Sequence, residues 1–563
     1  MEARFDASLT RMLSLRRTSS KASLNSITSF ASSINTKTAY KKLCRDLHQN
    51  GVTADMINRK ERQILDVFQS RTVDSGQNVR SQSNGVPVPT GSTLTENGSS
   101  STRNQIRSRP RWARPPMDFL FGPAMLAAAV AGDTKRLTNT LRNIRDIDFV
   151  DDSKETALLK AAWEGHNDIV RLLLNNGASI KVINRHGSTP LHIAVLNSDA
   201  DMVQLFLEQG ASINAINKDS NTPLHFAATK GYAPIVELLL KEGSSVETIG
   251  QFGRTPLHNA AKSGHIDTVQ LLLQKDASSE AIDTYGYTLL HLAALNGHTS
   301  MVQLLLDKGA FIGAIDKSRS TPLHLAAYNG HTTTVGLLLK KGASIEATNE
   351  ESSTPLHYAA FYGHPETVQL FLREGASIEA INKDNSTPLH LAAKYGHAVT
   401  IQILLESGAG IEAIDTDKYT PLHLATLRGH ITTIQLLLES GADIEAMDTD
   451  KHTPLHLATL RGHITTMQLL LESGADIEAM DMDKRTPLHL ATQHGNTATT
   501  QILLQKGANI EATDASNHTP LHLATQRGHT ATVQLLLEKG ASDQAINKNN
   551  LTLSSHGSLT TSP

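Results

Sequence analysis

The sequence predicts an all-α solenoid, in which short helix pairs stack one after another along most of the chain. Two observations predict it: the sequence repeats every 33 residues, and each repeat holds two short apolar stripes of helical spacing. Neither stripe exceeds roughly 11 residues, so neither helix would be stable alone in water. The apolar faces are buried only when neighbouring units stack, which is how a solenoid is stabilised.

The 33-residue period runs through most of the chain. Residues 416–447 and 449–480 differ only at Tyr419/His452 and Ile434/Met467. A threonine recurs at this spacing twelve times, and eleven of these threonines open a Thr-x-Leu-His tetrapeptide. One further unit, over about 122–153, lacks the tetrapeptide but keeps the spacing.

The unit that begins at Thr321 shows why each element is expected. Thr321 is an N-cap residue, and Pro322 supplies the backbone angle of a first helical turn. Leucines and alanines then form an apolar stripe, and Gly330 ends the first helix. The second helix should run from about His331 to Gly342, and a short extended link leads to the next threonine.

These residues resemble the ankyrin repeat. The family pattern appears in this unit as Thr321-Pro322-Leu323-His324, Ala326-Ala327-Tyr328-Asn329-Gly330-His331, Val335-Gly336-Leu337-Leu338 and Gly342-Ala343. The resemblance covers about residues 122–546. It implies a curved stack of helix pairs with short β-hairpin tips, and the function of binding other proteins.

Five segments are expected. They are a disordered tail rich in serine and arginine (1–37), a helical hairpin (38–71), a disordered linker (72–121), the solenoid (122–546) and a second disordered tail (547–563). Residues 1–121 hold 19 Lys and Arg against 9 Asp and Glu, whereas the remainder holds 33 against 46. A basic arm of net charge +10 therefore precedes an acidic array of net charge −13, which favours contact between them or separate partners.

The basic arm offers two further hypotheses. Arg16-Arg17-Thr18-Ser19 resembles the target of a basophilic kinase, so Ser19 is a candidate phosphorylation site, the alternative being an unmodified tail. The hairpin at 38–71 serves either as a docking or self-association module or as a helix pair that folds back onto the array.

Composition favours the cytoplasm, the nucleus or both. Cys44 is the single cysteine, which indicates a reducing compartment. No apolar run approaches the roughly 20 residues of a membrane helix, and the N-terminus lacks a secretory pattern. Five arginines and Trp112 lie between residues 103 and 114, but a solvated linker or import signal explains them better than nucleic-acid binding.

We expect neither an enzyme nor a cofactor or metal site. Twenty of the 26 histidines are accounted for by the repeat itself. Equivalent residues of stacked units lie about 8–10 Å apart, too far to share one zinc ion. The same spacing excludes a catalytic pair in the glutamate row, which is either an ordinary feature of the repeat or an acidic stripe for a basic partner: Glu346, Glu379, Glu412, Glu445, Glu478 and Glu511.

The candidate partner-binding residues are the ones that the fold does not need. In ankyrin repeats, the two residues before the glycine that ends the first helix usually contact partners, as do the hairpin tips. At these helix positions an aromatic group and a basic flank stand out, and they form the predicted footprint: Tyr328, Phe361, Tyr362, Tyr395, Arg428, Arg461 and Arg527.

The sequence thus predicts a non-enzymatic intracellular scaffold or adaptor that binds protein partners along its concave groove and tips. The alternative is a sensor or regulator, in which the array recognises a target and the hairpin at 38–71 signals by docking or self-association. We also expect the N-terminal third of the array to open before residues 321–540, because Ser198 and Asp276 replace helix-ending glycines.

Overall fold

The computed structural model describes residues 117–543, 551–553 and 559–561. Within these ranges, 26 α-helices form thirteen successive pairs. Ser19, the predicted tail at 1–37, the predicted hairpin at 38–71 and the arginine-rich stretch at 103–114 lie outside the described residues.

The helices have nearly constant length from unit to unit. The first helices of the pairs are α5 (Met117–Ala131), α7 (Ala157–Glu164), α9 (Pro190–Leu196), α11 (Pro223–Lys230), α13 (Pro256–Ser263), α15 (Leu289–Leu295), α17 (Pro322–Tyr328), α19 (Pro355–Tyr362), α21 (Pro388–Tyr395), α23 (Pro421–Arg428), α25 (Pro454–Arg461), α27 (Pro487–Gln493) and α29 (Pro520–Gln526). The second helices are α6 (Thr134–Leu141), α8 (Asn167–Asn175), α10 (Ala200–Glu208), α12 (Ala233–Lys241), α14 (Ile266–Gln274), α16 (Thr299–Asp307), α18 (Thr332–Lys340), α20 (Pro365–Arg373), α22 (Ala398–Glu406), α24 (Ile431–Glu439), α26 (Ile464–Glu472), α28 (Thr497–Gln505) and α30 (Thr530–Glu538).

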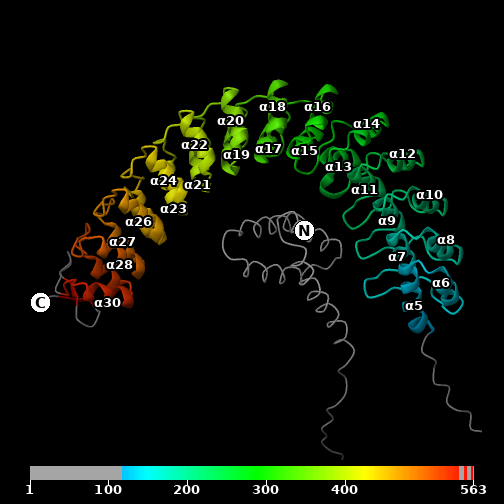
Figure 1. Ribbon diagram of the computed structural model, residues 1–563, viewed down its shortest axis with the longest axis horizontal. Helices are drawn as coiled ribbons and strands as arrows, with labels where there is room; N and C mark the ends of the chain where they lie inside the picture. Colours follow the sequence, from blue (N-terminus) through cyan, green and yellow to red (C-terminus); the bar gives the residue numbers. More distant parts are fainter. Residues whose placement is uncertain (1–116, 544–550, 554–558, 562–563) are drawn as a thin grey trace, which may run out of the picture. The chain divides into compact units, whose positions relative to one another are not determined.

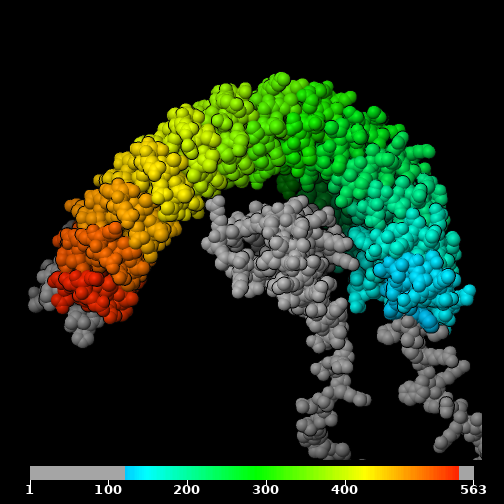
Figure 2. Space-filling model, in the orientation of Figure 1, coloured from blue at the N-terminus to red at the C-terminus, as the bar shows by residue number. Residues whose placement is uncertain are grey.

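The pairs follow one another along an arc, with the first helices on its inner side and the second helices on its outer side (Figure 1). Each first helix packs against the first helix of the next unit, as α19 does against α21. Figure 2 shows that successive units touch without a gap between them. The predicted curved solenoid of helix pairs is therefore confirmed.

The predicted N-caps are present, and histidine completes them. In the unit at Thr321, the threonine and His324 form a capping box, in which each side chain bonds to the backbone of the other residue. The main-chain N–H of Thr321 donates to Nδ1 of His324 over 3.1 Å. Pro322 occupies the first helical position. Eleven first helices, from α9 to α29, thus start at a position that their own tetrapeptide sets.

The hydrophobic core is shared between neighbouring units and is not confined to single units. Ala326, Ala327, Val335 and Leu338 are fully buried, and their apolar equivalents in the units before the last belong to one continuous cluster. The small alanines let neighbouring first helices approach closely. The last unit is an exception, because four of its buried residues form a separate small cluster: Leu521, Ala524, Leu536 and Ala541.

The links between units form tight hairpins. In the hairpin before Thr321, Asp316 bonds through its main chain to Ser320, and its Oδ1 also accepts the N–H groups of Ser318 and Ser320. The N–H of Lys317 donates to the carbonyl of Tyr285 in the preceding hairpin over 3.0 Å. The hairpins are thereby joined edge to edge, although no β-strand lies in the described links between the helix pairs.

The two ends of the array differ from the sequence-based boundaries. Helix α5 begins at Met117, within the range 72–121 that was assigned to a linker, and its sequence is apolar along most of its length. Within the range 547–563, assigned to a disordered tail, the structure places two short antiparallel strands, β1 (Leu551–Leu553) and β2 (Leu559–Thr561).

At the two positions where another residue replaces the helix-ending glycine, the backbone is left-handed, as expected. Ser198 and Asp276 adopt φ values of 58° and 61°. A left-handed residue with a side chain costs about 1 kcal/mol relative to glycine. We therefore expect Ser198→Gly and Asp276→Gly each to raise the free energy of unfolding by about 1 kcal/mol, measured by urea denaturation. Alanine at the same positions should bring no gain, and a gain from alanine would contradict this explanation.

Candidate functional site

Four of the predicted partner-binding residues form one aromatic cluster on the inner side of the arc. The ring centroids of Tyr328 and Tyr362 are 4.2 Å apart, and those of Phe361 and Tyr395 are also 4.2 Å apart. Phe361 and Tyr362 join the two pairs at 4.6 Å. The last turns of α17, α19 and α21 hold these side chains, so three successive units build one continuous aromatic surface.

One side of the aromatic cluster packs against the protein, and the other side is exposed to solvent. Tyr358 lies 6.2 Å from Tyr328 between ring centroids, and its hydroxyl accepts a hydrogen bond from Asn349 of the hairpin. Tyr362 and Tyr395 remain 38% and 40% exposed. Burial, followed by a side-chain hydrogen bond with Tyr328, raises the pKa of Tyr362, so its hydroxyl stays protonated and able to donate at neutral pH. Rigid, half-exposed tyrosines of this kind are suited to burial against a partner.

A basic groove continues the surface towards the C-terminus. It has a volume of about 630 Å³ and lies between the hairpins and the ends of the first helices. The groove is named for its helix side, which Lys394, Arg428 and Arg461 line, whereas three aspartates line the hairpin side: Asp384, Asp415 and Asp417. None of the three cations forms an ion pair within the described part of the chain. Their charge is therefore available to an acidic group of a partner.

Arg527 stands apart from the rest of the predicted footprint. It follows α29, and the unit between it and Arg461 presents Gln493 and His494 instead of arginine. Arg527 does not line the basic groove. The structure thus gathers the four aromatic residues in one cluster and places two of the three arginines in one groove.

A second aromatic group, on the hairpins, was not found from the sequence. Phe252 and Tyr285 lie 5.9 Å apart between centroids, and Tyr285 and Tyr287 lie 5.8 Å apart. The guanidinium of Arg254 lies 5.4 Å from the Phe252 ring. Tyr358 was missed as well, because it occupies a position where most units have a core leucine. A comparison of equivalent positions in all units would have revealed these departures.

The ten tetrapeptide histidines from His192 to His489 have both ring nitrogens hydrogen-bonded. Nδ1 of His324 accepts the N–H of Thr321, which leaves Nε2 protonated, and Nε2 donates to the carbonyl of Ser353 in the next unit over 3.0 Å. Burial lowers the pKa of His324 to about 4. The histidine is thus neutral at physiological pH and joins neighbouring units, which accounts for its recurrence without a metal or acid–base role.

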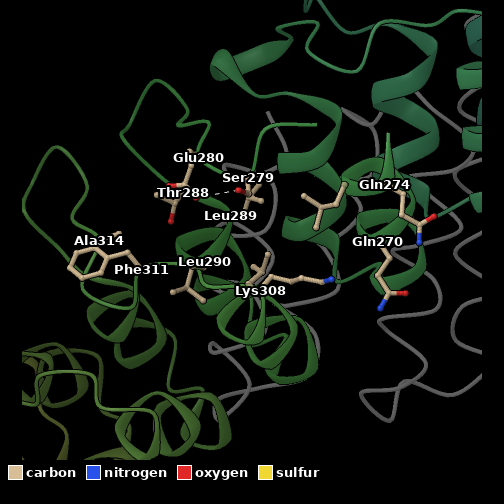
Figure 3. Close-up of a pocket in the computed structure, with 13 residues that line it drawn as sticks. Gln270, Gln274, Ser279, Glu280, Thr288, Leu289, Leu290, Lys308, Phe311 and Ala314 are labelled. Atoms are coloured by element: carbon tan, nitrogen blue, oxygen red, sulfur yellow. Dashed lines mark hydrogen bonds between the residues drawn. The ribbon is translucent and has the colours of Figure 1, made fainter. Parts of the chain in front are cut away.

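A pocket of about 630 Å³ interrupts the regular surface where the repeat pattern is broken (Figure 3). Leu289 replaces the usual proline there, and Phe311 stands where other units have a small or polar residue. Figure 3 shows Phe311 and Ala314 on one side of the pocket, away from Gln270 and Gln274. Phe311 is 71% exposed, and none of the predicted partner-binding residues lines this pocket.

The repeats match a known family model. The model described as ankyrin repeats (3 copies) matches residues 124–217, 187–249, 200–283, 224–316, 277–349, 323–415, 356–448, 412–481 and 455–550. The chain belongs to the ankyrin-repeat family. A comparison with curated proteins finds no significant match. Ankyrin repeats are a protein–protein interaction module.

The glutamate row of the ankyrin array has a structural role. The Oε1 atom of Glu346 accepts the N–H of Ser377 in the next unit over 2.7 Å, and Glu379 accepts the N–H of Gly410 over 2.6 Å. The same bond recurs for the other members of the row: Glu412, Glu445, Glu478 and Glu511. These carboxylates therefore connect units, while each retains its negative charge.

The described part of the ankyrin array contains no membrane-spanning helix. Each of its helices is too short or too polar to cross a lipid bilayer. Its helices instead bury their apolar side chains against neighbouring units, as Val335 and Leu338 do in α18.

Proposed function

We propose that this ankyrin protein is a non-enzymatic scaffold or adaptor of the cytoplasm or nucleus, and that it binds protein partners on the inner side of its array. The partner surface is the aromatic cluster of Tyr328, Phe361, Tyr362 and Tyr395. The helix side of the basic groove, with Arg428 and Arg461, forms its flank. The observation that supports this proposal is the continuous contact of these aromatic rings across three units.

The chemistry of the surface favours a partner with an apolar or aromatic anchor next to acidic residues. Tyrosine and arginine contribute a disproportionate share of the binding energy at protein interfaces. The neighbouring rings are already packed on one another, so little side-chain entropy is lost when a partner binds. Among the residues that the structure describes, the cations of the groove form no ion pair that a partner would have to break.

The experiment is a triple substitution in the full chain. Tyr328→Ala, Tyr362→Ala and Tyr395→Ala together should weaken capture of the partner from cell extract by at least about 100-fold. The measurement is quantitative mass spectrometry of the proteins that immobilised wild type and variant retain. The melting temperature should change little, because Tyr362 and Tyr395 are substantially exposed.

The matched control changes residues at the same helix positions in distant units. Lys230→Ala, Gln493→Ala and Gln526→Ala lie outside the aromatic cluster and should leave capture unchanged. If the tyrosine variant captures the same proteins as wild type, or if the control loses them equally, the aromatic cluster is not the partner surface.

A further inference from the structure

The hairpins carry a second exposed surface, which the aromatic cluster and the basic groove do not include. One apolar residue occupies the same position in ten of twelve hairpins, and these residues are 48–65% exposed. We call them the hairpin apolar row: Val150, Ile183, Ile216, Ile249, Ile282, Ile315, Ile381, Ile414, Met447 and Met480. The other two hairpins have Thr348 and Thr513 at this position.

The row is not needed for the fold. Side chains that remain about half exposed contribute little to the core. Two hairpins have threonine at this position in place of the apolar residue. Single exposed apolar residues are ordinary, but ten at equivalent positions form an extended apolar surface. Such surfaces mark contacts with another molecule.

The four C-terminal members of the row lie next to an acidic row. Glu379, Glu412, Glu445 and Glu478 each stand two residues before Ile381, Ile414, Met447 and Met480. Within the described residues, none of the four glutamates forms an ion pair, although each accepts a backbone N–H. Asp443 and Asp476 add further negative charge nearby, and together with burial they raise the pKa of Glu445.

The charges on the hairpin tips do not neutralise this acidic row. The tip aspartates Asp417, Asp450 and Asp483 are each followed directly by a lysine, so these pairs carry no net charge. The net charge beside the apolar row is therefore negative. A second copy of the array would bring like charge to the same surface, so charge complementarity favours a basic occupant.

The spacing of the row restricts the backbone of that occupant. Equivalent residues of stacked units lie about 8–10 Å apart, which is the packing distance of neighbouring helices. A β-strand turns alternate side chains away and repeats a face at about 6.7 Å or about 13 Å, which does not match. An α-helix rises about 10.5 Å in seven residues, which of these repeats is the nearest to the spacing of the row, so one apolar side chain per heptad can follow it over several units.

We propose that the hairpin apolar row from Ile381 to Met480 docks a basic amphipathic α-helix with one large apolar side chain in each heptad. The apolar side chains of this helix cover Ile381, Ile414, Met447 and Met480. Its lysines and arginines lie over the adjacent glutamates. The proposal does not depend on the aromatic cluster. It uses different residues, and the charged residues beside them are acidic, whereas those beside the aromatic cluster are basic.

The test uses the full chain and synthetic peptides. A fluorescein-labelled peptide of about three heptads has leucine at one heptad position and lysine and alanine elsewhere. Three companion peptides replace leucine by serine, replace lysine by glutamate, or gather the leucines within one turn. The proposal predicts that only the first peptide raises fluorescence anisotropy at physiological salt.

Threonine is a conservative substitution for the row, because two hairpins of the chain already have it at this position. Ile381→Thr, Ile414→Thr, Met447→Thr and Met480→Thr together should weaken peptide binding by at least about tenfold without shifting the thermal melt. The matched control is Val399→Thr, at an apolar residue of α22 that is 61% exposed and lies outside the row. This control and the triple tyrosine variant should both bind the peptide as wild type does.

Several results would overturn the proposal. If the serine peptide or the regrouped peptide binds as tightly as the first peptide, the array attracts the peptides by charge alone. Unchanged binding by the fourfold threonine variant, or loss of binding in the tyrosine variant, would place the peptide elsewhere. Self-association that the threonine variant abolishes would assign the row to a second copy. Crosslinks from a photoreactive label on Cys44 to the row would assign it to the chain's own basic arm.

Discussion

Acidification from about pH 7 to about pH 4 should unfold the ankyrin array, because its tetrapeptide histidines must stay neutral for the units to remain joined. Burial lowers the pKa of ten of these histidines, and for five of them the value falls to about 4: His192, His291, His324, His357 and His456. Protonation of Nδ1 removes the acceptor for the threonine N–H, as at Thr321. Each proton therefore breaks a helix cap and places a charge in the core.

The direction of the effect follows from the lowered pKa values. In the unfolded chain these five histidines take up protons near the ordinary pKa of 6.5, whereas in the folded array they take them up near 4. Between these values the unfolded state binds more protons, so the free energy of unfolding falls as the pH falls. The five histidines with a pKa of about 4 alone give a slope of about 6 kcal/mol per pH unit near pH 5 if the whole array unfolds together.

Urea denaturation followed by circular dichroism at a series of pH values and constant ionic strength would measure this slope. We expect the midpoint to change little above about pH 7 and to fall steeply below about pH 6. A midpoint that stays constant between about pH 6.5 and about pH 4.5 would show that the histidines are not held neutral by the fold.

Gly330→Ala should be among the most damaging single substitutions in the array. Gly330 has a φ of +68°, and a Cβ atom there would lie 2.5 Å from Nδ1 of His364 in the next unit. That histidine donates from Nε2 to the carbonyl of Tyr328 over 2.9 Å. Alanine would therefore add backbone strain and displace a bond between units, and we expect a loss of about 3 kcal/mol in the free energy of unfolding.

Gly462→Ala is a matched control for this substitution. Gly462 has nearly the same φ, +67°, but its nearest neighbour is the side chain of Asn496 at 3.9 Å. Only the backbone strain should remain, at a cost of about 1 kcal/mol. Urea denaturation of both variants separates the two contributions. Equal losses would contradict the role assigned to the histidine of the next unit.

The fold could be predicted from the sequence because every unit repeats the same local signals. Thr321, Pro322 and Gly330 mark the limits of one helix, and the same residue types recur at the same spacing in the other units. The start of the array was less certain from the sequence, because the unit that begins at Met117 lacks the tetrapeptide. The bonds between units were not predicted, because a contact such as that of His324 with Ser353 joins residues 29 positions apart.

The candidate site could be predicted only where its residues depart from the repeat. Tyr328, Phe361, Tyr362 and Tyr395 share helix positions that the fold leaves free, so the sequence singled them out, and the structure shows their rings in contact. Tyr358 was missed because it occupies a core position. The isoleucines and methionines of the hairpin apolar row were missed for the opposite reason, since an apolar residue in a repeat is expected to be buried.

The central claim is that a protein partner binds on the aromatic cluster, and photocrosslinking from position 361 tests it most directly. A photoreactive analogue of phenylalanine replaces Phe361 in one sample and the exposed Gln369 of α20 in another, and each full chain is irradiated in cell extract. The account predicts a specific protein adduct from position 361 that disappears when Tyr328, Tyr362 and Tyr395 are replaced by alanine. The same adduct from both positions, or one that persists in the tyrosine variant, would contradict it.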